Sequence, residues 1–94
     1  MLKIETEIKG TESQVKWATE IRNTMVKQIN ILLENAKRRS AESESCKKFA
    51  EIVEKHAELA VKRLSTLTAS QLIDNRNRSM ADMIEHNARK EFNA

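Results

Sequence analysis

The chain has 94 residues, with no proline, a single glycine and 33% charged side chains. Sheets and sandwiches need turn residues about every ten positions, so this composition predicts an all-α fold, a small helical bundle in one domain. The formal net charge of +3 permits contact with nucleic acid or with an acidic protein surface, and it demands neither.

The numbers of cysteine and histidine residues and the lengths of the apolar runs indicate which kinds of site and segment the chain lacks. One cysteine excludes an intramolecular disulfide, and two histidines far apart in sequence lack the spacing of a zinc site. No apolar run is long enough for a transmembrane span or for the core of a signal peptide. We therefore expect a cytoplasmic protein with no metal, no cofactor and no membrane contact.

Residues 2–9, LKIETEIK, alternate between charged side chains and side chains that are apolar or threonine. A period of two predicts extended backbone, so residues 1–10 are assigned to an N-terminal arm. No second strand is predicted in the chain. The arm must therefore dock on the helices, pair with its copy in a homodimer, or add to the sheet edge of a partner. We favour the docked arm and expect it to bury Ile4 and Ile8.

A first helix is predicted over residues 11–39, begun by a capping box between Thr11 and Gln14. Arg22 interrupts the apolar face of this helix, and its guanidinium either reaches water or meets a carboxylate inside the bundle. The other members of the face are predicted to point into the core: Val15, Trp17, Ala18, Ile21, Met25, Val26, Ile29, Leu32, Leu33 and Ala36.

A second helix is predicted over residues 41–67, and the short connection before it favours an antiparallel hairpin with the first helix. Basic side chains gather at this connection, where they suit the negative end of the first helix dipole. They also form the predicted partner-binding cluster, which consists of Lys37, Arg38, Arg39, Lys47 and Lys48.

Two shorter helices are predicted over residues 69–75 and 79–92, each begun by a threonine or serine capping box. Cys46 in the second helix is predicted to be a buried, inert thiol, and His56 a hydrogen-bonded or boundary residue. In the last helix the residues expected to face inward are Met80, Met83, Ile84 and Ala88.

Two motifs resemble those of a known group of proteins. Residues 10–22, GTESQVKWATEIR, resemble a G-[ST]-x-x-Q-x-x-W-A-x-x-I-R pattern, and residues 69–76, ASQLIDNR, resemble an A-x-x-(W)-I-D-N-R pattern. Both patterns occur, in this order, in a family of short helical proteins encoded by phages, plasmids and other mobile elements. The resemblance implies a genomic setting and no settled activity. The family often carries tryptophan just before the second pattern's Ile-Asp-Asn-Arg, where this chain has Gln71 and Leu72.

The motif residues Trp17, Arg22, Asp74 and Arg76 are predicted to be structural. We expect Arg22 to pair with Asp74, which begins the turn after the third helix, while Trp17 covers the contact. No residue is assigned a catalytic role, because the sequence has no glycine-rich phosphate loop, no metal-ligand spacing and no nucleophile beside a base.

These patterns favour a non-enzymatic protein-binding module of a phage or mobile element, acting as a monomer or a homodimer. Its partner is expected to be a host or phage protein complex. One form of this hypothesis is an inhibitor that covers a host defence complex, in the manner of anti-CRISPR proteins. The alternatives are a nucleic-acid-binding accessory protein, which the sequence pI of 9.2 favours, and a virion assembly component.

Overall fold

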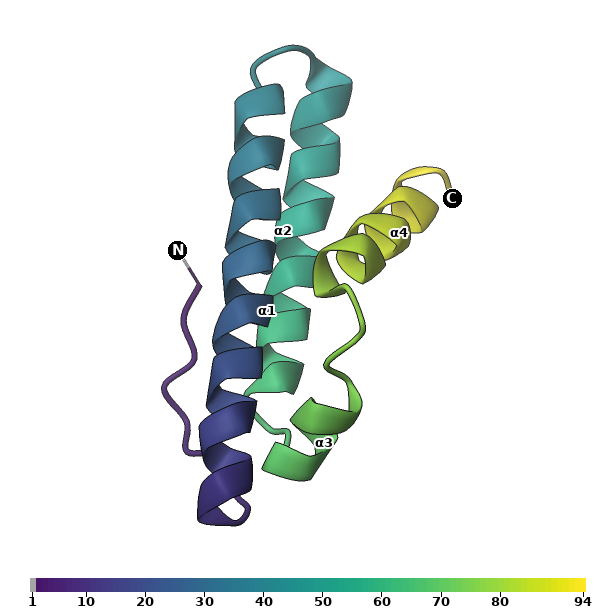
Figure 1. The fold of residues 1–94 in the computed structure, drawn as a ribbon. Helices are drawn as coiled ribbons and strands as arrows, with labels where there is room; N and C mark the ends of the chain where they lie inside the picture. The colour runs from purple at the N-terminus through teal and green to yellow at the C-terminus, as the bar shows by residue number, and fades with distance from the viewer. Residues whose placement is uncertain (1) are drawn as a thin grey trace.

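The computed structural model describes residues 2–94, and the predicted all-helical class is confirmed. Helices account for 73% of the residues, and the described chain contains no strand. The long helices α1 (Glu12–Arg39) and α2 (Glu44–Leu64) run side by side in opposite directions, and α3 (Ala69–Asp74) and α4 (Met80–Phe92) pack against them (Figure 1). Between residues 2 and 94, no helix is both long and apolar enough to cross a membrane.

Side-chain caps set where each helix begins. Thr11 and Thr68 form reciprocal capping boxes with the glutamine three residues later, as predicted. Ser43 caps α2, and its extended backbone places the start of α2 later than residue 41. Ser79 accepts from the backbone N–H of Asp82, but the reciprocal bond of a full capping box is not formed within residues 2–94.

The second helix ends at Leu64 and not at residue 67 as predicted. The hydroxyls of Ser65 and Thr66 donate to the carbonyls of Lys62 and Arg63, at 2.6 and 2.7 Å. Local side-chain bonds of this kind satisfy carbonyls of the last turn and compete with further helix. The chain can therefore leave α2 here and turn into α3.

The fully buried core occupies the part of the bundle away from the α1–α2 connection. On α1 no described residue beyond Ile29 is buried, and on α2 none before Val53. We call residues 32–50 the hairpin end. Six apolar side chains of the hairpin end are only half-buried: Leu32, Leu33, Ala36, Cys46, Phe49 and Ala50. The partial exposure of Cys46 corrects the prediction that it is a buried thiol.

Two residues predicted to face the core are exposed. Trp17 keeps 48% of its surface accessible and Met83 keeps 38%. Each lies at the edge of its helix's apolar face, and a helix buries only the stripe that its neighbours cover. In α4 that stripe is narrow, consisting of Met80, Ile84 and Ala88.

The arm, residues 2–9, runs along α1 on the side away from α4 (Figure 1). The side-chain amide of Asn30 holds its start, accepting from the N–H of Leu2 at 2.9 Å and donating to the carbonyl of Leu2 at 3.0 Å. At its other end, the N–H of Ala69 donates to the carbonyl of Lys9 at 2.8 Å. Ile8 is buried between these two points.

Ile4, which is also predicted to be buried, is only half-buried. Gly10 joins the arm to α1 at a point where the arm closely approaches α3. A Cβ on Gly10 would lie 2.7 Å from the Cβ of Ala69 at the start of α3, and its φ of 158° disfavours a side chain. The single glycine of the sequence is thus placed where the arm meets α3.

Candidate protein-interaction surface

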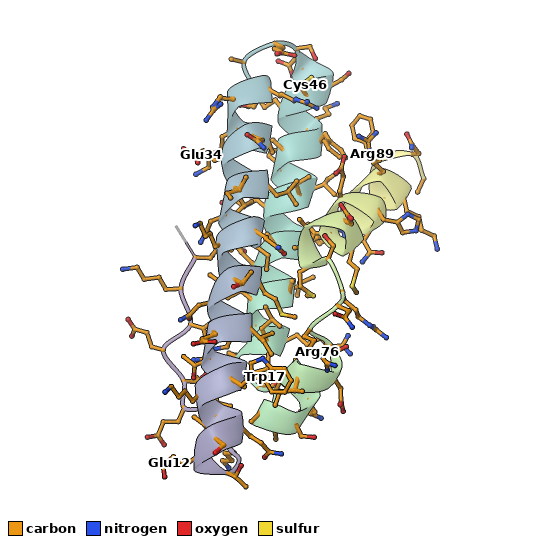
Figure 2. The ribbon with its side chains drawn as sticks, in the orientation of Figure 1. Glu12, Trp17, Glu34, Cys46, Arg76 and Arg89 are labelled. Atoms are coloured by element: carbon orange, nitrogen blue, oxygen red, sulfur yellow. The ribbon has the colours of Figure 1, made fainter. Side chains whose placement is uncertain are left out.

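Trp17 and Arg76, which come from the two sequence motifs, are brought together. The guanidinium carbon of Arg76 lies 5.3 Å from the centroid of the Trp17 ring, and Figure 2 shows the two side chains adjacent between α1 and the segment after α3. Arg76 also donates through Nη1 to the carbonyl of Ile73 at 2.7 Å. A cation within about 6 Å of an aromatic ring is attracted to its face. The contact therefore holds the segment after α3 on α1.

The predicted pairing of Arg22 with Asp74 is wrong. Arg22 is buried, with 7% of its surface exposed, whereas Asp74 is exposed at the end of α3, and no ion pair joins them in the described chain. Arg22 donates instead through Nη1 to the hydroxyl of Thr6, at 3.4 Å. The helical wheel predicts that Arg22 faces inward, but it does not reveal that the arm covers this part of α1.

The predicted basic cluster is divided between two faces of the hairpin end. All five side chains are exposed. Arg39 lines a groove shared with α4, whereas Lys37 and Lys47 line a smaller pocket of about 170 Å³ between α1 and α2. Arg38 and Lys48 line neither of these two cavities. The cluster therefore acts as a positive region around the connection and not as one focused site.

The charge of this region sets it apart from the remainder of the chain. Residues 37–48 contain five basic and two acidic side chains, an excess of three positive charges. That excess equals the formal net charge of the whole chain, so the other residues carry balanced charge. The whole hairpin end, residues 32–50, also contains Glu34 and so carries an excess of two positive charges. It forms a positive end of an elongated molecule that measures 48 by 24 by 18 Å.

A groove of about 430 Å³ lies between the hairpin end and α4. Besides apolar side chains, its lining contains one acidic, two basic and several uncharged polar residues: Glu85, Arg39, Arg89, Asn35, Ser45, Cys46 and Asn93. The rings of Phe49 and Phe92 meet edge to face in it, with centroids 5.6 Å apart and an interplanar angle of 82°. The guanidinium carbon of Arg89 lies 5.6 Å from the centroid of Phe49. Figure 2 labels Cys46 near the α1–α2 connection and Arg89 on α4. Arg89 is also paired within the groove, since its Nη2 donates to Oε1 of Glu85 at 2.8 Å. The groove thus combines two aromatic rings with the guanidinium of Arg39 and the Arg89–Glu85 ion pair.

Near its end, α4 is joined to α2 by the side chain of Glu91. Oε1 of Glu91 accepts from Nζ of Lys55 at 2.8 Å, and Nε2 of His56 lies 3.5 Å from the same oxygen. The hydrogen bond from Lys55, together with the positive charge beside it, holds the pKa of Glu91 below its ordinary value. Glu91 thus contacts α2 at residues 55 and 56, beside the groove.

Sequence reasoning missed Arg89 and Phe92 as members of this surface. In the sequence, the only indication of a shared surface is that Arg89 and Phe92 are three positions apart and so lie on one face of the last helix. Where α4 crosses α2 decides whether such residues meet Phe49, and that crossing is a property of tertiary packing. Among the residues described, no three histidine, cysteine or acidic side chains are grouped so as to hold a metal ion.

No family model, no curated protein and no solved structure matches the chain. The chemistry of the hairpin end is therefore the basis for assigning a function. Half-buried apolar side chains, aromatic rings and arginines are the groups that protein interfaces use most.

Proposed function

We propose that the chain is a non-enzymatic binding module whose hairpin end engages another protein. In this proposal, the groove between the hairpin end and α4 receives an acidic segment with apolar anchors. One observation carries the proposal: a half-buried apolar face continues past the reach of α4 at the place where positive charge is concentrated. Apolar anchors would pack against the aromatic rings, and acidic side chains would meet Arg39, because Arg89 is already paired with Glu85.

Charge favours an acidic partner over a second copy of the chain. Two hairpin ends placed against each other would bring two positive regions together, and like charges across an interface cost free energy. An acidic partner is attracted instead and is steered toward the hairpin end before contact. The motif resemblance supports a phage or other mobile element as the setting. There the protein would act without turnover, as a stoichiometric inhibitor that covers a host or phage protein complex.

The lone cysteine supplies a test because it lines the groove. A photo-crosslinker attached to Cys46 is expected to capture an acidic protein from the native host. A matched probe carries the crosslinker on the far end of the molecule, through Cys46→Ser with Ser70→Cys on the exposed surface of α3, and is expected to capture far less.

Charge reversal separates the groove from a general charge effect. Arg39→Glu is expected to abolish the crosslink, whereas Arg63→Glu, which changes the net charge equally at the other end of α2, is expected to preserve it. Both substitutions are at exposed positions, so thermal stability should stay close to wild type. Equal capture from both probe positions would contradict the proposal. Recovery of nucleic acid alone, in a complex that dissociates with added salt, would support the nucleic-acid-binding alternative.

A further inference from the structure

A buried positive charge without a carboxylate partner lies on the face of α1 beneath the arm. Arg22 is 7% exposed and makes one side-chain hydrogen bond within the described chain, the 3.4 Å bond to the neutral hydroxyl of Thr6. Its Nε is buried and has no hydrogen-bond partner there. Burial lowers the pKa of Arg22, since the charged form is desolvated. Buried charges are ordinarily paired with an opposite charge, and the guanidinium of Arg22 has no such partner in the described chain.

The arm covers Arg22 with few contacts of its own. The backbone of Leu2 is held by the side chain of Asn30, and the carbonyl of Lys9 by the N–H of Ala69. Between these points, Thr6 donates its hydroxyl to the carbonyl of Ser65 at 2.9 Å. Ile8 alone among the described arm residues is buried. Leu2 and Ile4 are half-buried against the core, so the arm is held by a few single hydrogen bonds and three apolar side chains.

We propose that the surface beneath the arm is a second binding site for an extended acidic segment of another protein. This surface is formed by Arg22, Asn30 and the pocket that holds Ile8. That segment displaces the arm and places a carboxylate where the hydroxyl of Thr6 lies. A carboxylate would give Arg22 a counter-ion, so that a hydrogen bond between two opposite charges replaces the 3.4 Å bond to a neutral hydroxyl. The amide of Asn30 can pair with the backbone of any extended segment, and the pocket of Ile8 accepts an apolar side chain two residues after the carboxylate.

The need for a carboxylate beside Arg22 argues against the arm of a second copy of the chain as the bound segment. The arm of another copy would again bring a threonine to Arg22, because Glu5 and Glu7 belong to the exposed row of the alternating pattern. An exchanged arm therefore repeats the contacts already present and leaves Arg22 without a counter-ion. This site lies apart from the hairpin-end groove and does not depend on the function proposed for it.

Synthetic peptides with the sequence of residues 2–9 test the site, one with Thr6→Asp and one with the nearly isosteric, neutral Thr6→Asn. The receptor is the full-length protein with Ile8→Ser, which loosens the protein's own arm and leaves Arg22 and Asn30 unchanged. We expect the Thr6→Asp peptide to bind about tenfold more tightly than the Thr6→Asn peptide, the factor that corresponds to one charge-assisted hydrogen bond. Calorimetry measures the affinities, and the NMR signal of the Arg22 Nε–H locates the contact.

Two receptor variants and the wild-type chain decide the outcome. Arg22→Met is expected to remove the preference for the acidic peptide, and Arg39→Glu at the hairpin end is expected to keep it. In the wild-type chain, excess Thr6→Asp peptide should shift the Arg22 Nε–H signal by displacing the arm, and this measurement decides the matter if Ile8→Ser does not fold. Equal affinity of the two peptides, a preference that persists in Arg22→Met, or no shift in the wild-type chain would overturn the proposal.

Discussion

Supplying the missing carboxylate within the chain is expected to stabilise the fold. In Thr6→Asp, a carboxylate oxygen replaces a hydroxyl that lies 3.4 Å from Nη1 of Arg22. A hydrogen bond between Arg22 and a carboxylate contributes about 1.5–3 kcal/mol. The two lost bonds of the Thr6 hydroxyl, to the carbonyl of Ser65 and the long one from Arg22, together subtract about 1–2 kcal/mol. The net gain is about 1 kcal/mol. For a domain of this size, that gain raises the melting temperature by about 4–8 °C.

The gain should depend on pH in a defined direction. Arg22 would hold the pKa of the introduced carboxylate below its ordinary value of about 3.9. The added stability is then fully present above the ordinary pKa and is lost as the pH falls through the depressed one. Thermal melts followed by circular dichroism at neutral and acidic pH measure both effects. Thr6→Asn, which adds no charge, is the matched control.

A double-mutant cycle with Arg22→Met completes the assay. In that background Thr6→Asp should give no stabilisation, because the charge it pairs with is absent. Arg22→Met alone is expected to be neutral or stabilising, since it replaces a buried unpaired charge with an apolar side chain of similar length. An unchanged melting temperature in Thr6→Asp at neutral pH, or the same gain in Thr6→Asn, would refute the reasoning about Arg22.

Three further substitutions test other parts of the fold. Gly10→Ala should destabilise the protein by about 1–3 kcal/mol in urea denaturation, because the new methyl group overlaps α3 at 2.7 Å. Glu91→Gln should lower the melting temperature at neutral pH and reduce its further loss on acidification. The pKa of Glu91 is depressed, so its bond to Lys55 stabilises above the ordinary pKa and is lost as the pH falls through the depressed one. Arg76→Ala should cost about 0.5–1 kcal/mol and change the fluorescence of Trp17, the only tryptophan.

The local features of this fold were accessible from the sequence. The capping boxes at Thr11 and Thr68 depend on residues three positions apart, so the starts of α1 and α3 follow from the chain alone. The buried residues Ala18, Met25 and Ile29 likewise follow from helical periodicity. The all-helical class follows from the absence of turn residues.

The relations between elements were not accessible in this way. The predicted contact of Arg22 with Asp74 failed because a helical wheel gives a direction and not the identity of the covering segment. Trp17 and Arg76 were both singled out, yet their contact depends on the path taken after α3. The groove at the hairpin end depends on how α4 packs across α2, where Phe92 meets Phe49. Tertiary packing decides each of these outcomes.

The way the arm is held has a consequence for the kinetics of folding. Its start is fixed by Asn30 and its end by Ala69, residues that reach their positions only when α1 and α3 are in place. Docking of the arm also closes loops of many residues, which is entropically unfavourable early in folding. The arm should therefore be absent from the folding transition state. Substitutions in it would then leave the refolding rate nearly unchanged and alter the rate of unfolding, so the arm serves to lengthen the lifetime of the folded state.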